Sequence, residues 1–187
     1  MMPAYCASHD RGENFMKTVG MAVAFLCAVA VSPGLAGATE DLPKESVLPS
    51  ALAAKAVQAA IEHCKRDGYR VSASVVDRSG LLRSMTRADG AGPHTIDSSR
   101  KKAYTATSLR RPTSELADMI SKTPTLQALR DMNEQILMVG GGLPIEIGGE
   151  VVGGIGVGGA PGAHLDDACA EAGLDAIGAA PKVPTGK

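Results

Sequence analysis

The spacing of apolar residues changes several times along the chain and predicts a mixture of helices and strands. Five segments show helical spacing or the cap signals of helices: residues 51–67, 96–109, 113–121, 125–132 and 166–177. Five short apolar runs, most of them rich in β-branched residues, are predicted strands: 71–76, 81–86, 136–139, 143–147 and 150–157. Most strands follow one another through turns rather than through helices, which favours an antiparallel sheet. The predicted fold class is therefore α+β, with helices covering the sheet.

Glycine interrupts the C-terminal half of this pattern in two different ways. Gly148 and Gly149 separate the last two predicted strands and suit the positive φ angles of a tight turn. Further along, glycines alternate with Ile155 and Val157, as residues of a strand would. A dinucleotide-binding loop would need its glycines after a strand and at the start of a helix. We therefore interpret this segment as a strand against which a helix or a neighbouring subunit packs closely.

The first 38 residues have the pattern of a secretory signal peptide. A lysine precedes an apolar run over 19–31, and the small residues of 35–38 end it. This run is shorter than the ~20 residues of a membrane span. We therefore expect cleavage after Ala38, no stable membrane insertion afterwards, and a periplasmic or secreted protein. Residues 1–15 read as an upstream extension, because Met16 begins a complete signal by itself.

The remaining chain is long enough for one domain with its own core. We divide it into a linker over 39–49, a single domain over 50–180 and a tail over 181–187. The chain has 19 Lys and Arg against 20 Asp and Glu, a net charge of −1, which argues against a nucleic-acid partner. It has no Trp and only 3% aromatic residues, so stacking on bases is also disfavoured.

A glycine- and proline-rich loop before the second predicted helix is the best candidate for a binding site. Gly90 and Gly92 let the backbone approach a ligand closely, and Pro93 fixes the start of the helix. The first turn of a helix presents free N–H groups and a partial positive charge to an anion. His94 stands at this junction. Its imidazole either contacts a ligand or bonds only the neighbouring backbone.

The same stretch resembles a known family signature. The segments R-A-D-G-A-G-P-H-T-I over 87–96 and K-A-Y-T-A over 102–106 are similar to the signature of the GlcG/HbpS-like haem-binding family. Other similar elements follow in the family's order: V-V-D-R-S-G over 75–80, G-G-G-L-P-I over 140–145 and the glycine-rich segment over 153–160. Together they cover about residues 48–179. The family usually has Ser where Gly158 stands, so no hydroxyl role is carried over to that position.

The resemblance implies a profilin-like domain with a five-stranded antiparallel sheet flanked by helices. It also implies haem as the cofactor and a symmetric homo-oligomer, from a dimer to an octamer. In that fold the first and last helices can pack side by side, which would allow a disulfide between Cys64 and Cys169. An oxidising compartment permits such a bond. The alternative is that both cysteines are small buried apolar residues.

From the resemblance we expect haem, or another small anionic ligand, at the loop and the helix that follows it. His94 is the expected iron ligand, because neutral imidazole binds haem iron well. The propionates would lie near basic side chains, and Tyr104 would flank the porphyrin or supply a phenolate. The expected ligand-binding residues are Arg87, Asp89, Gly90, His94, Thr95, Lys101 and Tyr104.

Two functions remain open at this point. The first is an exported haem-binding protein that sequesters haem or hands it on. The second is an accessory enzyme of small-molecule catabolism, of the GlcG type, acting on a small hydroxy or oxo acid. The secretion signal favours the first function, as does the lack of a recognisable nucleophile motif in the sequence. No catalytic residue is assigned.

Overall fold

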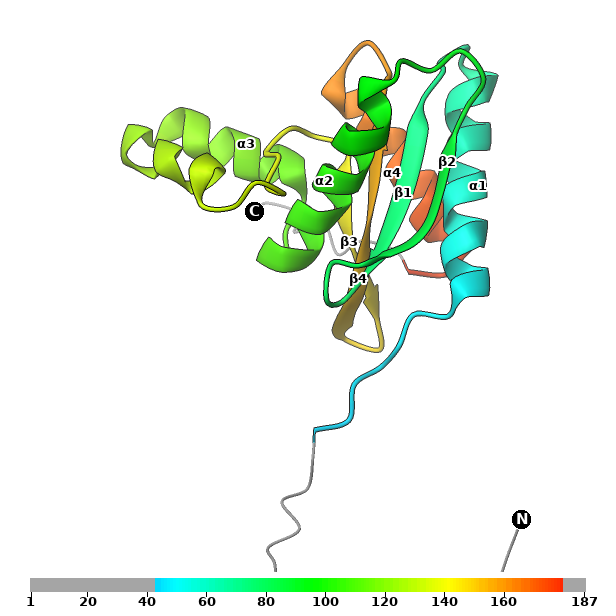
Figure 1. Cartoon of the computed structure of the whole chain (residues 1–187), viewed down its shortest axis with the longest axis horizontal. Coiled ribbons are helices and arrows are strands. Elements are labelled where there is room, and N and C mark those ends of the chain that lie inside the picture. Colours follow the sequence, from blue (N-terminus) through cyan, green and yellow to red (C-terminus); the bar gives the residue numbers. More distant parts are fainter. Residues whose placement is uncertain (1–42, 180–187) are drawn as a thin grey trace, which may run out of the picture. The chain divides into compact units, whose positions relative to one another are not determined.

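The structure is a computed structural model that describes residues 43–179. The predicted signal peptide over 1–38 and the predicted tail over 181–187 lie outside these residues. The elements in chain order are α1 (Ser50–Arg66), β1 (Ser72–Asp77), β2 (Leu82–Arg87), α2 (His94–Leu109), α3 (Thr113–Lys122), the 3-10 helix η1 (Pro124–Asp131), β3 (Gly142–Ile147), β4 (Glu150–Gly158) and α4 (Ala163–Ala176) (Figure 1). Within the described range, no helix is both long and apolar enough to cross a membrane.

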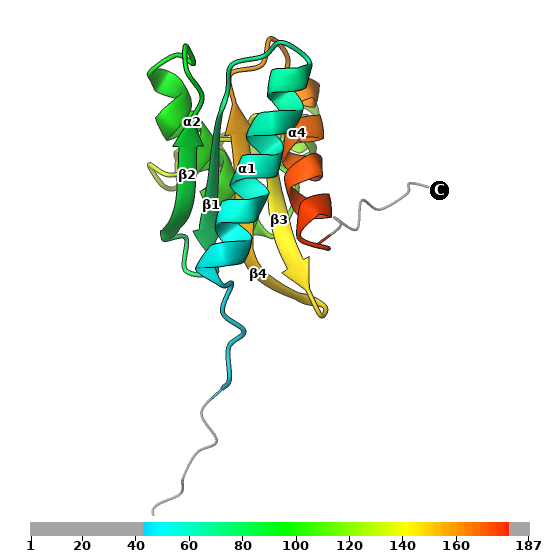
Figure 2. The same cartoon turned by 90° about the vertical axis from the view of Figure 1, so that its right-hand side faces the viewer.

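Four antiparallel strands form one sheet in the order β2–β1–β4–β3. Helix α2 covers one face of this sheet, and α1 and α4 lie side by side on the other face (Figures 1 and 2). The α3–η1 segment extends away from the sheet beside α2. The predicted α+β class with an antiparallel sheet and covering helices is therefore confirmed.

The expected fifth strand, over residues 136–139, is wrong. Ile136 and Met138 are buried in a small cluster with residues of α3 and η1, separate from the main core. The N–H of Leu137 donates to the hydroxyl of Thr105 on α2, at 2.8 Å, rather than to a neighbouring strand. The Thr105 side chain on α2 thus accepts the Leu137 N–H, which in a sheet would have paired with a neighbouring strand. The sheet has four strands rather than five.

Alternate glycines of β4 bring the sheet into backbone contact with α2. A Cβ atom on Gly156 would lie 2.5 Å from the backbone nitrogen of Ala103 and closer still to the carbonyl oxygen of Ser99. A Cβ atom on Gly154 would lie 2.6 Å from the carbonyl oxygen of Ala103. Only hydrogen fits at these positions. The interpretation of this segment as a strand with a closely packed helix is therefore confirmed.

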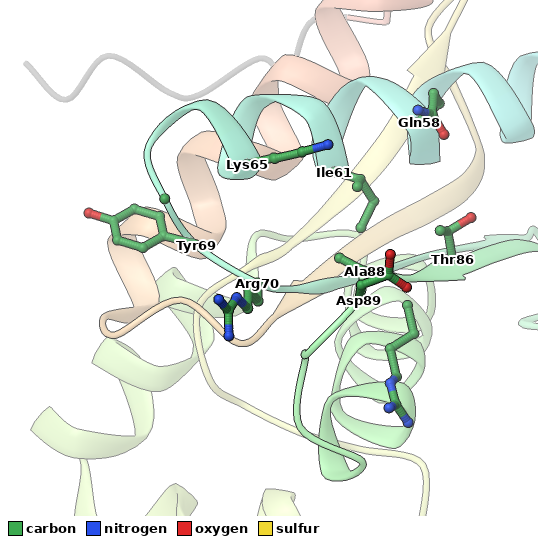
Figure 3. A pocket seen from close by; sticks show the side chains of 10 residues that line it. Gln58, Ile61, Lys65, Tyr69, Arg70, Thr86, Ala88 and Asp89 are labelled. Carbon is green, nitrogen blue, oxygen red and sulfur yellow. The ribbon is translucent and has the colours of Figure 1, made fainter.

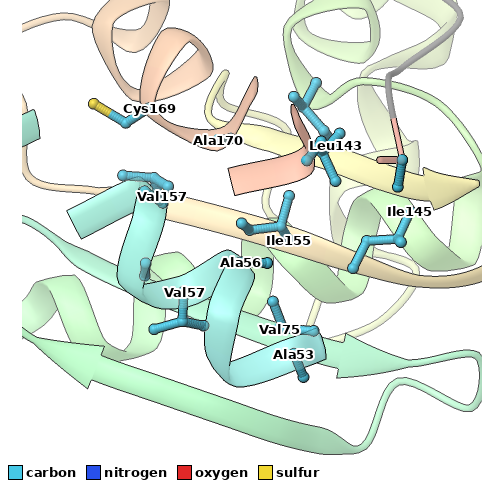
Figure 4. Packing of buried hydrophobic residues seen from close by; sticks show 14 of the residues in the cluster. Ala53, Ala56, Val57, Val75, Leu143, Ile145, Ile155, Val157, Cys169 and Ala170 are labelled. Atoms are coloured by element: carbon cyan, nitrogen blue, oxygen red, sulfur yellow. The ribbon is translucent and has the colours of Figure 1, made fainter. Parts of the chain in front are cut away.

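The other face of the sheet carries the main hydrophobic core. Ile155 and Val157 of β4 pack there with apolar residues of α1 and α4 (Figure 4). Leu48, within the predicted linker, is buried in the same core at 1% exposure. The disulfide between Cys64 and Cys169, with an S–S distance of 2.06 Å, joins α1 to α4. The two cysteines are thus bonded as well as buried.

Candidate ligand-binding site

The loop before α2 holds His94 at the surface on a well-defined backbone. Helix α2 begins at His94 itself, two residues earlier than predicted, and Pro93 occupies the N-cap position. The imidazole lies against Gly92, where a Cβ atom would come within 2.7 Å of the ring carbon Cε1. His94 is exposed, and its imidazole forms no hydrogen bond with any residue over 43–179. Both ring nitrogens are therefore available to a ligand.

Thr95 faces the sheet rather than the surface. It is 1% exposed, and its hydroxyl donates to the carbonyl oxygen of Gly92 at 2.6 Å. The same hydroxyl lies 2.7 Å from the Ser72 hydroxyl of β1. One turn further on, the hydroxyls of Ser99 and Ser74 are also 2.7 Å apart. These two hydroxyl pairs fix the first half of α2 on β1, and so they hold the backbone that presents His94.

The structure separates Tyr104 from His94. Tyr104 lies ten residues along α2 from His94, which corresponds to about 15 Å of helix. Its ring packs on Gly80 in the turn between β1 and β2, where a Cβ atom would lie 2.6 Å from ring carbons. Lys101 lies between these two residues on the helix and is half-buried. Gly80 therefore makes room for the Tyr104 ring at a different part of the surface.

Arg87 and Asp89 line a groove beside α1, on the other side from α2 of the loop that joins β2 to α2. The groove has a volume of about 480 Å³ and runs between the C-terminal half of α1 and the end of β2 (Figure 3). This volume is within the range of about 300–1,000 Å³ of small-molecule sites. Its lining residues are Gln58, Ile61, Lys65, Gly68, Tyr69, Arg70, Thr86, Arg87, Ala88 and Asp89.

Three cations from separate segments line this groove. Lys65 comes from α1, Arg70 from the segment before β1, and Arg87 from the end of β2. None of these three side chains forms an ion pair or hydrogen bond with another described residue, and the same holds for the side chain of Asp89. Sequence reasoning missed Gln58, Ile61 and Lys65, although their helical spacing, which puts them on one face of α1, could have grouped them. No such spacing groups Arg70 with them, because it lies outside α1.

Gly90 connects the groove to the loop that carries His94. Its φ angle is +78°, in the left-handed region that favours glycine. A Cβ atom on Gly90 would lie 3.0 Å from Cδ and 3.2 Å from Nη1 of Arg70. The arginine side chain thus lies over the glycine, four residues before His94. Of the predicted site residues, Arg87 and Asp89 line the groove, Gly90 contacts it only through Arg70, and His94 does not line it.

A second group of charged residues is enclosed where α2, α4 and the triple-glycine loop meet. The Lys102 ammonium donates to Oδ2 of Asp166 at 2.8 Å and to the carbonyl oxygen of Val157 at 2.9 Å. Both side chains of this ion pair are 5% exposed. Oδ1 of Asp166 accepts the N–H of Ala160 at 3.0 Å. Sequence reasoning missed this pair because nothing in the sequence distinguishes Lys101 from Lys102. The rotation of α2 relative to the sheet decides that Lys102 is the buried one.

The neighbouring carboxyl group, Asp167, also reaches the triple-glycine loop. Its Oδ1 accepts the N–H of Gly141 at 2.5 Å. Burial raises the pKa of Asp167 above its ordinary 3.8, and hydrogen bonds from Gly141 and Ser114 and the charge of Lys102 oppose that rise. The hydrogen bond from Gly141 to this carboxyl group ties α4 to the loop between η1 and β3.

Comparison with known proteins identifies the family. The family model described as "Haem degrading protein HbpS-like" matches residues 48–175. The chain belongs to the HbpS-like family. It is 41% identical over 103 residues to the "Uncharacterized 15.0 kDa protein in dhaT-dhaS intergenic region" of Citrobacter freundii, covering 54% of this chain and 72% of that protein.

Solved structures agree with this assignment. A double mutant of HbpS from Streptomyces reticuli superimposes with a TM-score of 0.69 and 40% identity, covering 77% of this chain and 96% of the other. A complex of PduOC with heme superimposes with a TM-score of 0.65 and 25% identity, covering 70% of this chain and 95% of the other. The resemblance noted in the sequence is therefore confirmed at the level of the family.

Proposed function

We propose that this HbpS-like protein binds haem after export and either sequesters it or hands it on. The observation that carries the proposal is the free imidazole of His94, exposed on a fixed helix start and separated from a cationic groove by one short loop. The heme complex of a structural relative supports the same ligand class. Export rests on the signal pattern over 1–38, which lies outside the described residues.

The described residues fit haem in their donor chemistry. Neutral imidazole is a common axial ligand of haem iron, and His94 would take that role. Basic side chains suit the propionates, and the groove supplies three of them. No group of three or more His, Cys, Asp or Glu gathers as a metal site among residues 43–179. A porphyrin-held iron, which needs only an axial ligand, is compatible with that arrangement. Haem would bring redox-active iron to this surface.

The test is a titration of the full chain with hemin, followed by absorbance. We expect binding to shift and sharpen the Soret band relative to that of free hemin, and we expect His94→Ala to weaken binding at least tenfold and to alter the Soret and visible bands. Loss of the imidazole removes an iron ligand without touching the core, so the fold should be unchanged. Parent-like spectra from His94→Ala would exclude this residue as the ligand, and a Soret band that stays that of free hemin in the presence of the parent would contradict the proposed function.

His164 offers a matched control for His94. It also lies at the start of a helix, it is exposed, and its ring packs against a glycine two residues earlier, Gly162. His63 is a second control, because its ring is 3.1 Å from Arg66 and 3.9 Å from Asp67 on the same helix. Hemin binding by His164→Ala and His63→Ala should stay within about twofold of the parent.

Oligomerisation is part of the same proposal. Val139, which is 44% exposed, lines a hollow of about 410 Å³ together with Ile120, Ile136 and Met138 of the small cluster, and Met132 is 51% exposed. A homo-oligomer, from a dimer to an octamer, would cover such apolar surface. Light scattering of the mature chain at micromolar concentration should give a multiple of the chain mass. A monomer mass would contradict this part of the proposal.

A further inference from the structure

We propose that the groove between α1 and β2 binds the carboxylate edge of the tetrapyrrole through Lys65, Arg70 and Arg87. This inference rests on the proposed function and adds a location and a set of contacts to it. A ligand bound there would lie beside the loop between β2 and α2, and His94 stands at the end of that loop where α2 begins. The groove and the imidazole would then serve a single ligand.

The first argument is that the groove cations lack partners inside the protein. Six of the other seven described arginines bind a side chain or a carbonyl group of the chain: Arg66, Arg78, Arg83, Arg100, Arg111 and Arg130. The seventh, Arg110, also lacks such a partner among the described residues, but it does not line the groove. Arg70 and Arg87 have no such partner among residues 43–179, and neither has Lys65. The folded structure therefore gains no ion pair or hydrogen bond from these three charged groups. Their gathering around one hollow favours an anionic ligand from outside.

The second argument is charge complementarity. The groove brings together Lys65, Arg70 and Arg87 with one carboxylate, Asp89, and so it carries two excess positive charges. Two carboxylates neutralise this excess. The planar guanidinium groups also match a carboxylate in geometry, because each can donate two parallel hydrogen bonds.

The third argument is the apolar floor of the groove. Ile61 is 7% exposed and belongs to the main core, and Ala88 packs against the same core. In Figure 3, Ile61 points from α1 toward the segment that carries Ala88 and Asp89. A groove with an apolar floor and a charged rim suits a ligand that has both an apolar ring edge and carboxylates. A small, fully polar dicarboxylate would leave that floor unused.

The fourth argument is the contact between Arg70 and Gly90. The guanidinium-bearing side chain lies over the glycine of the loop, at a position where even a Cβ atom would press on it. A carboxylate held by Arg70 would therefore lie beside the loop that leads to His94. This contact gives Gly90 a function beyond its positive φ angle.

The test uses metal-free protoporphyrin IX, which has the carboxylates but no iron, and its dimethyl ester, which has neither. Binding to the full chain is followed by porphyrin fluorescence. We expect Arg70→Gln/Arg87→Gln to bind protoporphyrin IX at least tenfold more weakly than the parent. The control Arg110→Gln, an exposed arginine just after α2, should stay within about twofold. Arg70→Lys/Arg87→Lys keeps the charges and should recover part of the affinity.

The dimethyl ester should bind weakly and equally to the parent and to the double Gln variant. The groove proposal is overturned if the double Gln variant binds protoporphyrin IX like the parent, or if the parent binds the ester as tightly as the diacid. Hemin distinguishes this failure from failure of the proposed function. Equal hemin binding by the parent and the double Gln variant overturns the groove proposal but leaves the proposed function standing, whereas a parent that does not change the hemin Soret band contradicts the proposed function even if it binds protoporphyrin IX.

Discussion

Polar side chains on the α2 face of the sheet have hydrogen-bond partners within the protein, whereas the charged side chains of the groove beside α1 have none among the described residues. On the α2 face, hydroxyls pair across the interface, and the buried Lys102 ammonium reaches both Asp166 and a backbone carbonyl. No buried side-chain nitrogen or oxygen among the described residues lacks a hydrogen-bond partner. At the groove, by contrast, the charged groups of Lys65, Arg70 and Arg87 line a hollow and form no ion pair or hydrogen bond with a described residue.

This difference separates residues that maintain the fold from residues that are free to bind. A buried polar group without a partner costs about 1–3 kcal/mol, so the enclosed face has to satisfy its own groups. Exposed cations remain hydrated and carry little such cost. Substitutions on the α2 face should therefore change stability, whereas substitutions in the groove should change ligand affinity at nearly constant stability.

The largest expected effect is at the glycine contact. Gly156→Val would push a branched side chain into the backbone of α2 at Ser99 and Ala103. We expect this variant to fail to fold, or to lose more than about 4 kcal/mol of unfolding free energy. Gly148→Ala is the control, because Gly148 has a φ of +63° but nothing within 4 Å of its Cβ position. It should lose only about 1–2 kcal/mol. Urea unfolding measures both, and equal losses would contradict the close packing.

The next effect concerns the enclosed ion pair. Lys102→Met keeps the packing volume but leaves the Asp166 carboxylate buried without its cation. We expect a loss of about 3–5 kcal/mol of unfolding free energy. Adding Asp166→Asn removes the charge while an oxygen remains to accept the N–H of Ala160. The double variant should therefore be more stable than Lys102→Met alone, and a further loss of stability would contradict this account.

The smallest effect is a pH dependence at Asp167. Its pKa is raised in the folded protein, mainly by burial, so the folded state holds this proton more tightly than the unfolded state. Stability from this group therefore falls as the pH rises from 3.8 through the raised pKa. Asp167→Asn should remove that fall, whereas Asp175→Asn, on the exposed side of α4, should leave it in place. Urea unfolding at a series of pH values tests this, and identical pH profiles for Asp167→Asn and the parent would contradict it.

Local patterns predicted most of the fold. The alternation of glycine with Ile155 and Val157 indicated the close strand–helix contact, and the pair Gly148–Gly149 has the positive φ angles expected of the turn, 63° and 84°. Residues 136–139 were misassigned, since an apolar run alone does not show whether a strand or a helix side chain will meet its backbone.

The candidate site was less accessible to sequence reasoning. The loop up to His94 is continuous, and its residues could be recognised together. The groove instead combines side chains from α1, from the segment before β1 and from the end of β2, so only the folded chain brings Lys65 and Arg70 to Arg87. Burial of Thr95 depends on the phase of α2 relative to the sheet, which a helix with many polar residues does not reveal.

The most direct test of the account is amide hydrogen exchange with and without gallium protoporphyrin IX, a redox-inactive analogue of haem. We expect slower exchange on binding over residues 61–70 and 86–94, which include every residue of the groove lining except Gln58, and the loop up to His94. Exchange in β4 and in the second half of α2 should change little, because these segments are already enclosed. Protection confined to α3 and η1, or no protection anywhere, would contradict the claim that the groove and its loop form the ligand site.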